Sequence, residues 1–151
     1  MAPLFFCAPA KADVLTLNEQ LTCLTEAIYF ESRGEDFLGQ LAVANVILNR
    51  VRHVKFPNTV CEVVHEGLYW KKNPIRNKCQ FSYWCDGKSE QMKDHTASDQ
   101  AKRIAILSLA GARIQNMENV LYYHASYMRP YWIDYVKRVE KIGTHIFYRS
   151  K

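Results

Sequence analysis

Residues 41–48 (LAVANVIL) constrain the fold more than any other part of the chain. Every residue of this segment is apolar except Asn45. A helix that begins after Gly39 and runs towards Val51 is therefore apolar on nearly all sides, which is typical of a helix buried at the centre of a domain. We expect the rest of the chain to supply the elements that cover it.

A helix with a single apolar face is predicted before this segment. Its apolar residues recur at steps of three and four: Leu21, Leu24, Ala27 and Ile28. Asn18 or Thr22 is placed to cap the start of this helix, and Gly34 is placed to end it. After the central helix, Thr59 can cap a further short helix.

The later part of the chain is predicted to contain one long helix and several short strands. Residues 67–95 are rich in aromatic and polar side chains, which is typical of loops and short strands. A long helix capped near Thr96 or Ser98 follows, with three residues expected to face inward: Ile104, Leu107 and Ile114. Residues 119–124 and 144–148 have the composition of strands. Helices early and strands late predict an α+β domain.

The first twelve residues (MAPLFFCAPAKA) differ in composition from the rest of the chain. Lys11 is their one charged residue, and small residues precede Asp13 in the pattern that signal peptidases recognise. We interpret residues 1–12 as the remnant of a signal peptide, with a disordered N-terminus as the alternative. Residues 13–151 are then long enough to form a single domain with a hydrophobic core.

Outside residues 1–12 the chain has four cysteines: Cys23, Cys61, Cys79 and Cys85. An even number after an export signal predicts two disulfides, with three possible connectivities. Cys79 and Cys85 are close enough in sequence to close a small loop, which leaves Cys23 for Cys61. Zinc is the alternative ligand, but the gap between Cys79 and Cys85 does not match its usual spacing. We therefore expect disulfides, no metal site, and export to the periplasm or beyond the cell.

The net charge of +5 is compatible with binding to polyanions, which include bacterial envelopes and nucleic acids. The basic residues are scattered and form no recognisable unit for reading a nucleic-acid groove, so we expect no nucleic-acid partner. No stretch approaches the roughly 18 apolar residues of a transmembrane helix. The five histidines show no paired spacing such as H-E-x-x-H, which argues against a metalloamidase.

Glu31 is the next residue along the apolar face of the first predicted helix. Partial burial there would raise the pKa of its carboxyl group, as a general acid for a glycosidic oxygen requires near neutral pH. The alternative is a surface ion pair with Arg33 or Arg50. Glu26 lies off the apolar face, and Glu35 follows the glycine that ends the helix; these two are the competing glutamates.

Several segments, in order, resemble the SleB-type cell wall hydrolases, the family of the spore-cortex lytic enzyme catalytic domain. The longest are residues 23–35 (CLTEAIYFESRGE) and 39–51 (GQLAVANVILNRV). The shorter ones are residues 56–61 (FPNTVC), 79–82 (CQFS), 86–87 (DG), 122–124 (YYH) and 142–149 (IGTHIFYR). Together they extend over nearly the whole chain after residue 20.

The resemblance implies a lysozyme-like fold related to lytic transglycosylases, mainly helical with a small antiparallel sheet. It also implies cleavage of peptidoglycan between N-acetylmuramic acid and N-acetylglucosamine, without a cofactor. The catalytic glutamate of the family is the first in its E-A-R-G-E motif, which here is Glu31 of residues 31–35 (ESRGE).

Aromatic rings suit the C–H faces of sugars, and polar side chains suit their hydroxyl groups. On this basis the predicted substrate-binding residues are Gln80, Phe81, Ser82, Trp84, Tyr122, Tyr123 and His124. Packing beneath a loop is the alternative role for the aromatic members, and His124 could instead satisfy a buried backbone carbonyl.

The lack of a second well-placed carboxylate favours a lytic transglycosylase, in which the 6-hydroxyl of muramic acid attacks and leaves a 1,6-anhydromuramic end. Inverting and retaining glycosidases usually need two carboxylates, and the only further candidates are Asp86 and Asp134. A hydrolytic muramidase remains the alternative.

Two other functions stay open. One is a peptidase that cuts the stem peptides, with Cys79 or Cys85 as nucleophile and His124 or His145 as base. The other is a non-catalytic peptidoglycan-binding module. We expect a monomer, and cell wall remodelling, spore germination and a phage-encoded enzyme acting on a host wall are all compatible with the sequence.

Overall fold

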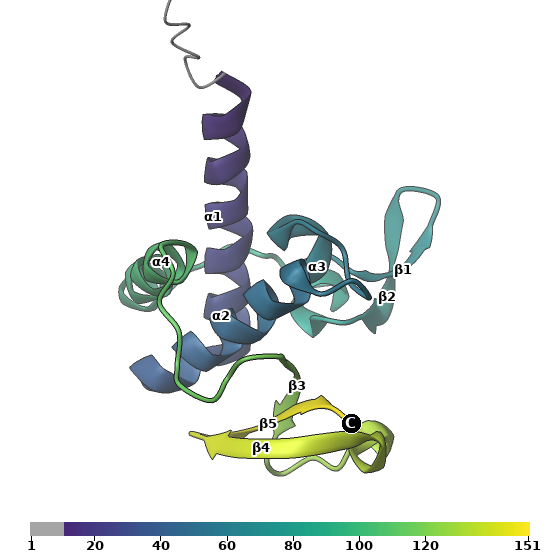
Figure 1. Cartoon of the computed structure of the whole chain (residues 1–151). Helices are drawn as coiled ribbons and strands as arrows, with labels where there is room; N and C mark the ends of the chain where they lie inside the picture. Colours follow the sequence, from purple (N-terminus) through teal and green to yellow (C-terminus); the bar gives the residue numbers. More distant parts are fainter. Residues whose placement is uncertain (1–10) are drawn as a thin grey trace, which may run out of the picture.

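The computed structural model describes residues 11–151 and confirms the α+β class (Figure 1). The helices are α1 (Lys11–Ser32), α2 (Phe37–Arg52), α3 (Val60–Val64) and α4 (His95–Leu109). The strands are β1 (Gly67–Trp70), β2 (Asn73–Cys79), β3 (Val120–Ala125), β4 (Val136–Ile142) and β5 (His145–Ser150). Two 3₁₀ turns, η1 (Ser82–Cys85) and η2 (Tyr131–Tyr135), complete the elements. The predicted leader falls mostly on residues 1–10, which lie outside the described residues, while Lys11 and Ala12 belong to the first turn of α1.

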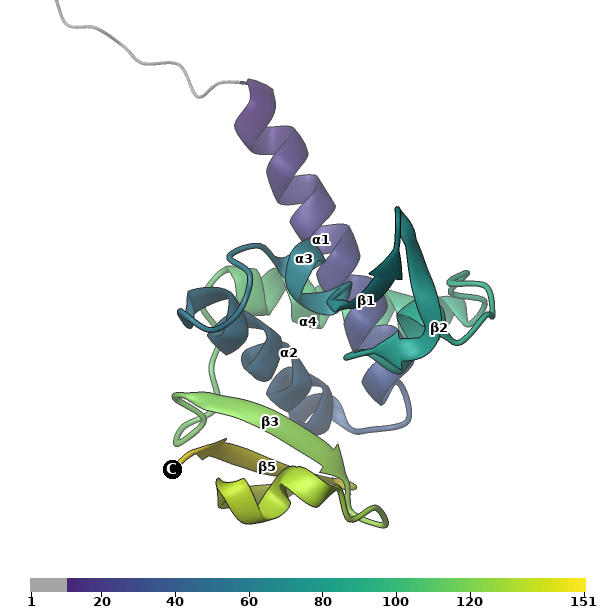
Figure 2. The same cartoon turned by 90° about the vertical axis from the view of Figure 1, so that its right-hand side faces the viewer.

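Helix α2 is the buried centre of the domain, as its composition predicts. Residues 41–48 are all buried, and α2 contacts α1, α3, α4, β3 and β4. The polar Asn45 is satisfied there, because its side-chain amide donates to Ala112 O and its Oδ1 accepts from the Ile114 amide. In Figure 2, α2 lies between the other helices and the sheet formed by β3 and β5.

Helix α1 begins earlier than the capping residues predicted. Asn18 and Thr22 lie inside the helix, where the Thr22 hydroxyl donates to Asn18 O one turn back. Threonine and asparagine satisfy backbone groups both at caps and within helices, so their presence alone does not mark a start. The end of α1 is close to the prediction, because Gly34 lies in the turn that follows Ser32.

The starts of α2 and α4 differ from the prediction because an aspartate caps each of them. Asp36 accepts from the Gly39 amide, so α2 begins at Phe37, before Gly39. Asp94 accepts from the Ala97 amide and begins α4 before Thr96 and Ser98. The predicted cap of α3 is confirmed, because Thr59 accepts from the Glu62 amide.

The inward face of α4 was predicted only in part. Ile104 is buried, but Leu107 is exposed and Ile114 lies beyond the end of the helix. The buried face instead carries Ala101, Ala105 and Ser108, because small residues let α4 approach α1 and α2 closely.

A three-stranded antiparallel sheet forms the other side of the domain, in the order β3-β5-β4. Strands β3 and β5 match the segments predicted as strands, while β4 was not predicted. The sheet packs on α2 through β3, and Phe147 of β5 and Val120 of β3 are fully buried there. A second, two-stranded hairpin of β1 and β2 projects sideways from the helices, with its turn pointing away from the three-stranded sheet (Figure 1).

Two disulfides cross-link the fold, one between two helices and one between a strand and a 3₁₀ turn. Cys23 of α1 is bonded to Cys61 of α3, and Cys79 at the end of β2 is bonded to Cys85 in η1. These are the pairs that sequence spacing favoured. They leave no thiol among the cysteines of residues 11–151, so the nucleophiles required for a cysteine–histidine peptidase are absent from the described part of the chain.

Candidate active site

A cavity of about 940 Å³ lies where the end of α1, the sheet and the loop after β3 meet. The residues that line it come from both sides of the domain: Phe30 and Glu31 of α1, Arg50 of α2, Lys55 after α2, residues 80–82 after β2, part of residues 122–136, and His145, Ser150 and Lys151 at the C-terminal end. A ligand site of this size accommodates more than one sugar ring. The cavity is therefore the candidate substrate site.

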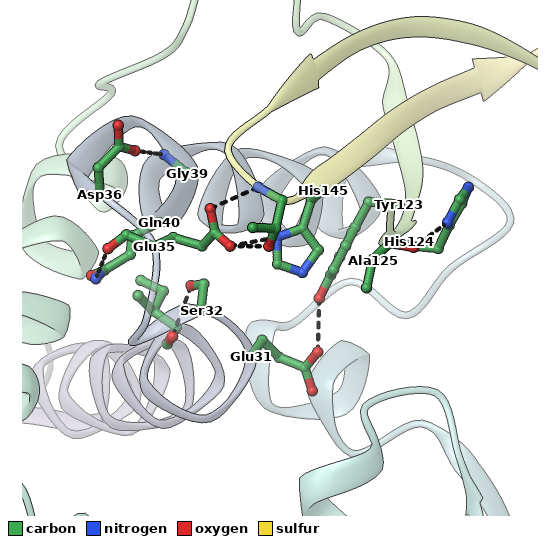
Figure 3. Close-up of polar contacts among 12 residues, drawn as sticks. Glu31, Ser32, Glu35, Asp36, Gly39, Gln40, Tyr123, His124, Ala125 and His145 are labelled. Atoms are coloured by element: carbon green, nitrogen blue, oxygen red, sulfur yellow. Dashed lines mark hydrogen bonds and ion pairs between the residues drawn. The ribbon is translucent and has the colours of Figure 1, made fainter. Parts of the chain in front are cut away.

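Glu31 is half-buried at the wall of this cavity, on the last turn of α1. The Tyr123 hydroxyl, on β3, donates to its Oε2 at 3.1 Å, as Figure 3 shows. Burial raises the pKa of the Glu31 carboxyl, and the Tyr123 hydrogen bond and the Arg50 charge oppose this rise. The net effect is a raised pKa, which keeps the proton on Glu31 at higher pH than on an exposed glutamate.

Tyr123 is held rigidly against Glu31. Its ring packs edge-on against His145, with 5.3 Å between centroids, and stacks on Phe147 at 5.6 Å. Burial and the nearby Glu31 raise the pKa of the Tyr123 phenol well above its usual value. Tyr123 therefore stays a hydrogen-bond donor to Glu31 throughout the neutral range.

The two competing glutamates do not line the cavity. Glu26 is half-buried on α1, and burial, followed by the charge of Glu90, raises the pKa of its carboxyl group. Glu35 accepts hydrogen bonds from the amide and the hydroxyl of Thr144 and lies 3.6 Å from His145 Nδ1 (Figure 3). Glu35 thus ties the turn after α1 to the turn between β4 and β5.

Neither expected arginine forms an ion pair with Glu31. Arg33 donates to the Tyr29 hydroxyl at 2.8 Å. Arg50 is buried, and its Nε donates to Leu121 O. Glu31 is therefore available to a ligand in the cavity.

Most of the predicted substrate-binding residues line the cavity: Gln80, Phe81, Ser82, Tyr122, Tyr123 and His124. Trp84 does not, because its ring stacks on His65 with 3.5 Å between centroids and its Nε1 donates to the Tyr69 hydroxyl. Gln80 and Ser82 are exposed, whereas Phe81 is buried beneath the Arg50 guanidinium. The segment after β2 thus presents the polar side chains of Gln80 and Ser82 to solvent, while the Phe81 ring packs beneath the surface.

Both ring nitrogens of His124 are engaged with the protein. Nδ1 donates to Ala125 O at 2.8 Å, which leaves Nε2 to accept from the Tyr148 hydroxyl at 2.8 Å. Trp132 packs edge-on against both rings. His124 therefore shapes the cavity wall chiefly by anchoring Tyr148 and Trp132.

Sequence reasoning missed an aromatic segment that lines the cavity. Residues 127–135 (YMRPYWIDY) follow β3, and five of them reach the cavity: Tyr127, Met128, Pro130, Trp132 and Tyr135. Four aromatic residues within nine positions are the signal that could have identified the segment. Arg50 and His145 also line the cavity and were not predicted to bind substrate.

Glu31 is the only acidic residue among the described residues that line the cavity. Asp86 and Asp134, the other carboxylates considered, are not part of the lining. The Asp86 carboxylate instead accepts from the Lys88 amide. Within residues 11–151 no cluster of three His, Cys, Asp or Glu side chains is arranged to hold a metal ion. In the same residues, no helix has the length and apolar character to cross a membrane.

Comparisons with known proteins give one consistent result. The family model described as Cell Wall Hydrolase matches residues 34–148, a range that begins just after Glu31. The spore cortex-lytic enzyme of Bacillus subtilis (strain 168) is 32% identical over 130 residues, which are 86% of this chain and 37% of that protein. That of Bacillus cereus is 34% identical over 86% of this chain and 44% of its own length. The chain therefore spans less than half the length of these curated relatives.

Solved structures agree with these relatives. The catalytic domain of the germination-specific lytic transglycosylase SleB from Bacillus anthracis is 34% identical, has a TM-score of 0.67, and aligns over 86% of this chain and 93% of that chain. The catalytic domain of the Bacillus cereus SleB protein is 31% identical and has a TM-score of 0.63; it aligns over 87% of this chain and 91% of that chain. The lysozyme-like α+β fold implied by the sequence is thereby confirmed, while nothing in these comparisons supports a phage-encoded origin.

Proposed function

Because this chain belongs to the cell wall hydrolase family, we propose that it cleaves the glycan strand of peptidoglycan between N-acetylmuramic acid and N-acetylglucosamine. The observation that carries the proposal is Glu31, a half-buried carboxyl group with a raised pKa at the wall of a cavity large enough for a saccharide chain. Residues 13–151 would form the catalytic domain, exported behind the leader of residues 1–12 and active as a monomer. The two disulfides support an oxidising compartment.

Glu31 acts first as the general acid. The Tyr123 hydroxyl donates to Oε2, so the acidic proton resides on Oε1. As the bond between C1 of muramic acid and the bridging oxygen breaks, this proton passes to that oxygen, which departs as the 4-hydroxyl of N-acetylglucosamine. Tyr123 then stabilises the carboxylate that remains, because its hydrogen bond strengthens when the acceptor becomes charged.

The lack of a second carboxylate favours transglycosylation as the next step. Among the described residues that line the cavity, only Glu31 can accept a proton as a carboxylate. The 6-hydroxyl of the same muramic acid attacks C1, its proton passes to Glu31, and a 1,6-anhydro ring forms without water. This step restores the acid form of Glu31. A hydrolytic muramidase would instead place a water molecule there and usually use a second carboxylate.

Digestion of purified peptidoglycan by the wild type and Glu31→Gln tests the proposal. We expect soluble fragments from the wild type that are lighter by one water molecule than muramidase products, and none from Glu31→Gln. Fragments of full muramidase mass would refute transglycosylation but keep the cleavage. Unchanged release by Glu31→Gln would refute the role of Glu31.

Glu26→Gln is the matched control, because Glu26 lies on the same helix, is half-buried with a raised pKa, and does not line the cavity. It should cleave like the wild type. Glu31→Gln should fold at least as well as the wild type, since a carboxyl whose pKa is raised by folding weakens the fold above its unfolded pKa, by about 1.4 kcal/mol per pKa unit at neutral pH. If the chain were a non-catalytic binding module, neither the wild type nor Glu26→Gln would release soluble fragments from peptidoglycan.

A further inference from the structure

The side chain of Arg50 is buried at the floor of the cavity. It is 7% exposed, and within the described residues its hydrogen bond to protein runs from Nε to Leu121 O at 2.8 Å. The rings of Phe56 and Phe81 lie 5.1 and 5.4 Å from the guanidinium carbon. These contacts fix the guanidinium group in one orientation and leave its two terminal nitrogens to the cavity.

No carboxylate of the described residues lies within ion-pair distance of the Arg50 guanidinium. Burial lowers its pKa, and the more distant Glu66 and Glu31 act in the opposite direction. Among the described residues the only ion pair within 4.0 Å joins Glu35 and His145. A buried guanidinium without a counter-charge destabilises a fold, so its presence in a cavity indicates a ligand that supplies the charge.

The other charged residues that line the cavity increase this imbalance. Lys55 and Lys151 are exposed at its edge, and Glu31 is its only carboxyl group among the described residues. When Glu31 carries the proton needed for catalysis, the remaining charged side chains among the described residues of the lining are those of Arg50, Lys55 and Lys151, all of them cations. The cavity then has the charge that an anionic group of the substrate would complement.

We propose that Arg50 binds a carboxylate borne by the muramic acid next to the cleaved bond, and so selects muramic-acid glycans over polymers of N-acetylglucosamine alone. The inference rests on the proposed cleavage of peptidoglycan. The carboxylate has two possible sources: the lactyl group, which is free on strands without stem peptides, or the stem peptide itself. Arg50 suits either source, because the planar guanidinium binds carboxylates through two parallel hydrogen bonds.

Binding in the inactive Glu31→Gln background tests the inference separately from catalysis. The probes are a peptide-free muramic-acid tetrasaccharide, the same tetrasaccharide with its lactyl carboxyls methylated, and one that carries stem peptides. We expect Arg50→Gln, added to Glu31→Gln, to weaken binding of the free-carboxylate probe about tenfold or more and to leave the methyl ester unaffected. Arg50→Lys should bind the free-carboxylate probe more tightly than Arg50→Gln and more weakly than the protein that retains Arg50. Lysine keeps the charge but cannot form two parallel hydrogen bonds to a carboxylate.

Arg52→Gln is the matched control, because Arg52 is exposed on the same helix and does not line the cavity. It should bind all three probes normally. If Arg50→Gln weakens binding of the peptide-bearing probe alone, the stem peptide is the source of the carboxylate.

Two outcomes would overturn the inference. In one, Arg50→Gln weakens binding of the methyl-ester probe as much as binding of the free-carboxylate probe, which means that Arg50 contributes through packing alone. In the other, Arg50→Gln in the active enzyme shifts the pH profile without raising KM, which means that its charge acts only on Glu31. If the Glu31→Gln protein still cleaves glycan, the proposed catalytic role fails while the binding result stands.

Discussion

The Cys23–Cys61 disulfide should contribute far more to stability than the Cys79–Cys85 disulfide. Its cysteines are 38 residues apart in sequence, against 6 for the second pair. Loop-closure entropy then gives about 4 kcal/mol for the first disulfide and about 2 kcal/mol for the second. In a chain of 151 residues the Cys23→Ala/Cys61→Ala variant should therefore melt about 8–16 °C below the wild type.

Thermal unfolding followed by far-UV circular dichroism measures this difference. Cys79→Ala/Cys85→Ala is the matched control, and it should lower the melting temperature by about half as much. Because Glu31 lies on the same helix as Cys23, cleavage should also be measured at 25 °C, after circular dichroism has shown that both variants are folded at this temperature. We expect nearly normal cleavage there and an earlier loss of it on heating in the Cys23→Ala/Cys61→Ala variant.

Equal melting temperatures for the two double variants would refute the entropy argument. A larger fall in the Cys79→Ala/Cys85→Ala variant would refute it as well. It would indicate that local packing around η1, and not restriction of the unfolded chain, determines what these disulfides contribute.

Two further predictions concern the cavity and its support. Tyr123→Phe removes the hydrogen bond that lowers the pKa of Glu31, so the alkaline limb of the pH–activity profile should move to higher pH; an unmoved limb, or one moved to lower pH, would contradict the role of Glu31 as acid. At Gly143, which has φ +57°, an added Cβ would lie 1.8 Å from Glu35 Oε2, so Gly143→Ala should displace Glu35 and cost about 2–3 kcal/mol in chemical denaturation. Backbone strain alone at this φ costs about 1–2 kcal/mol, so a loss of about 1 kcal/mol or less would contradict the clash.

Features with a local cause could be predicted from the sequence. The apolar segment around Asn45 indicated the buried helix, because nothing in it could face water. The position of Glu31 on the inward face of α1 could be predicted because helical periodicity fixes it whatever surrounds that helix. The cap of α3 at Thr59 depends on contacts only three residues apart, and it too was correct.

Features that depend on distant segments could not be predicted. Tyr123 is 92 residues from Glu31, and no local pattern connects the two. Trp84 is a residue type that often binds sugars, but in the folded protein the His65 ring stacks on its indole ring. Strand β4 was missed because a register shift between Arg138 and Glu140 breaks the alternation of buried and exposed residues that identifies strands.

The order of strands in the sheet has a consequence for the growing chain. Strand β5 follows β3 and β4 in the sequence but lies between them, so neither can form its sheet hydrogen bonds until residues 145–150 have been made. Glu31 is synthesised 92 residues before its partner Tyr123, which lies on β3 and depends on that pairing. A nascent chain therefore cannot complete the contact between Glu31 and Tyr123 until synthesis has passed the middle strand.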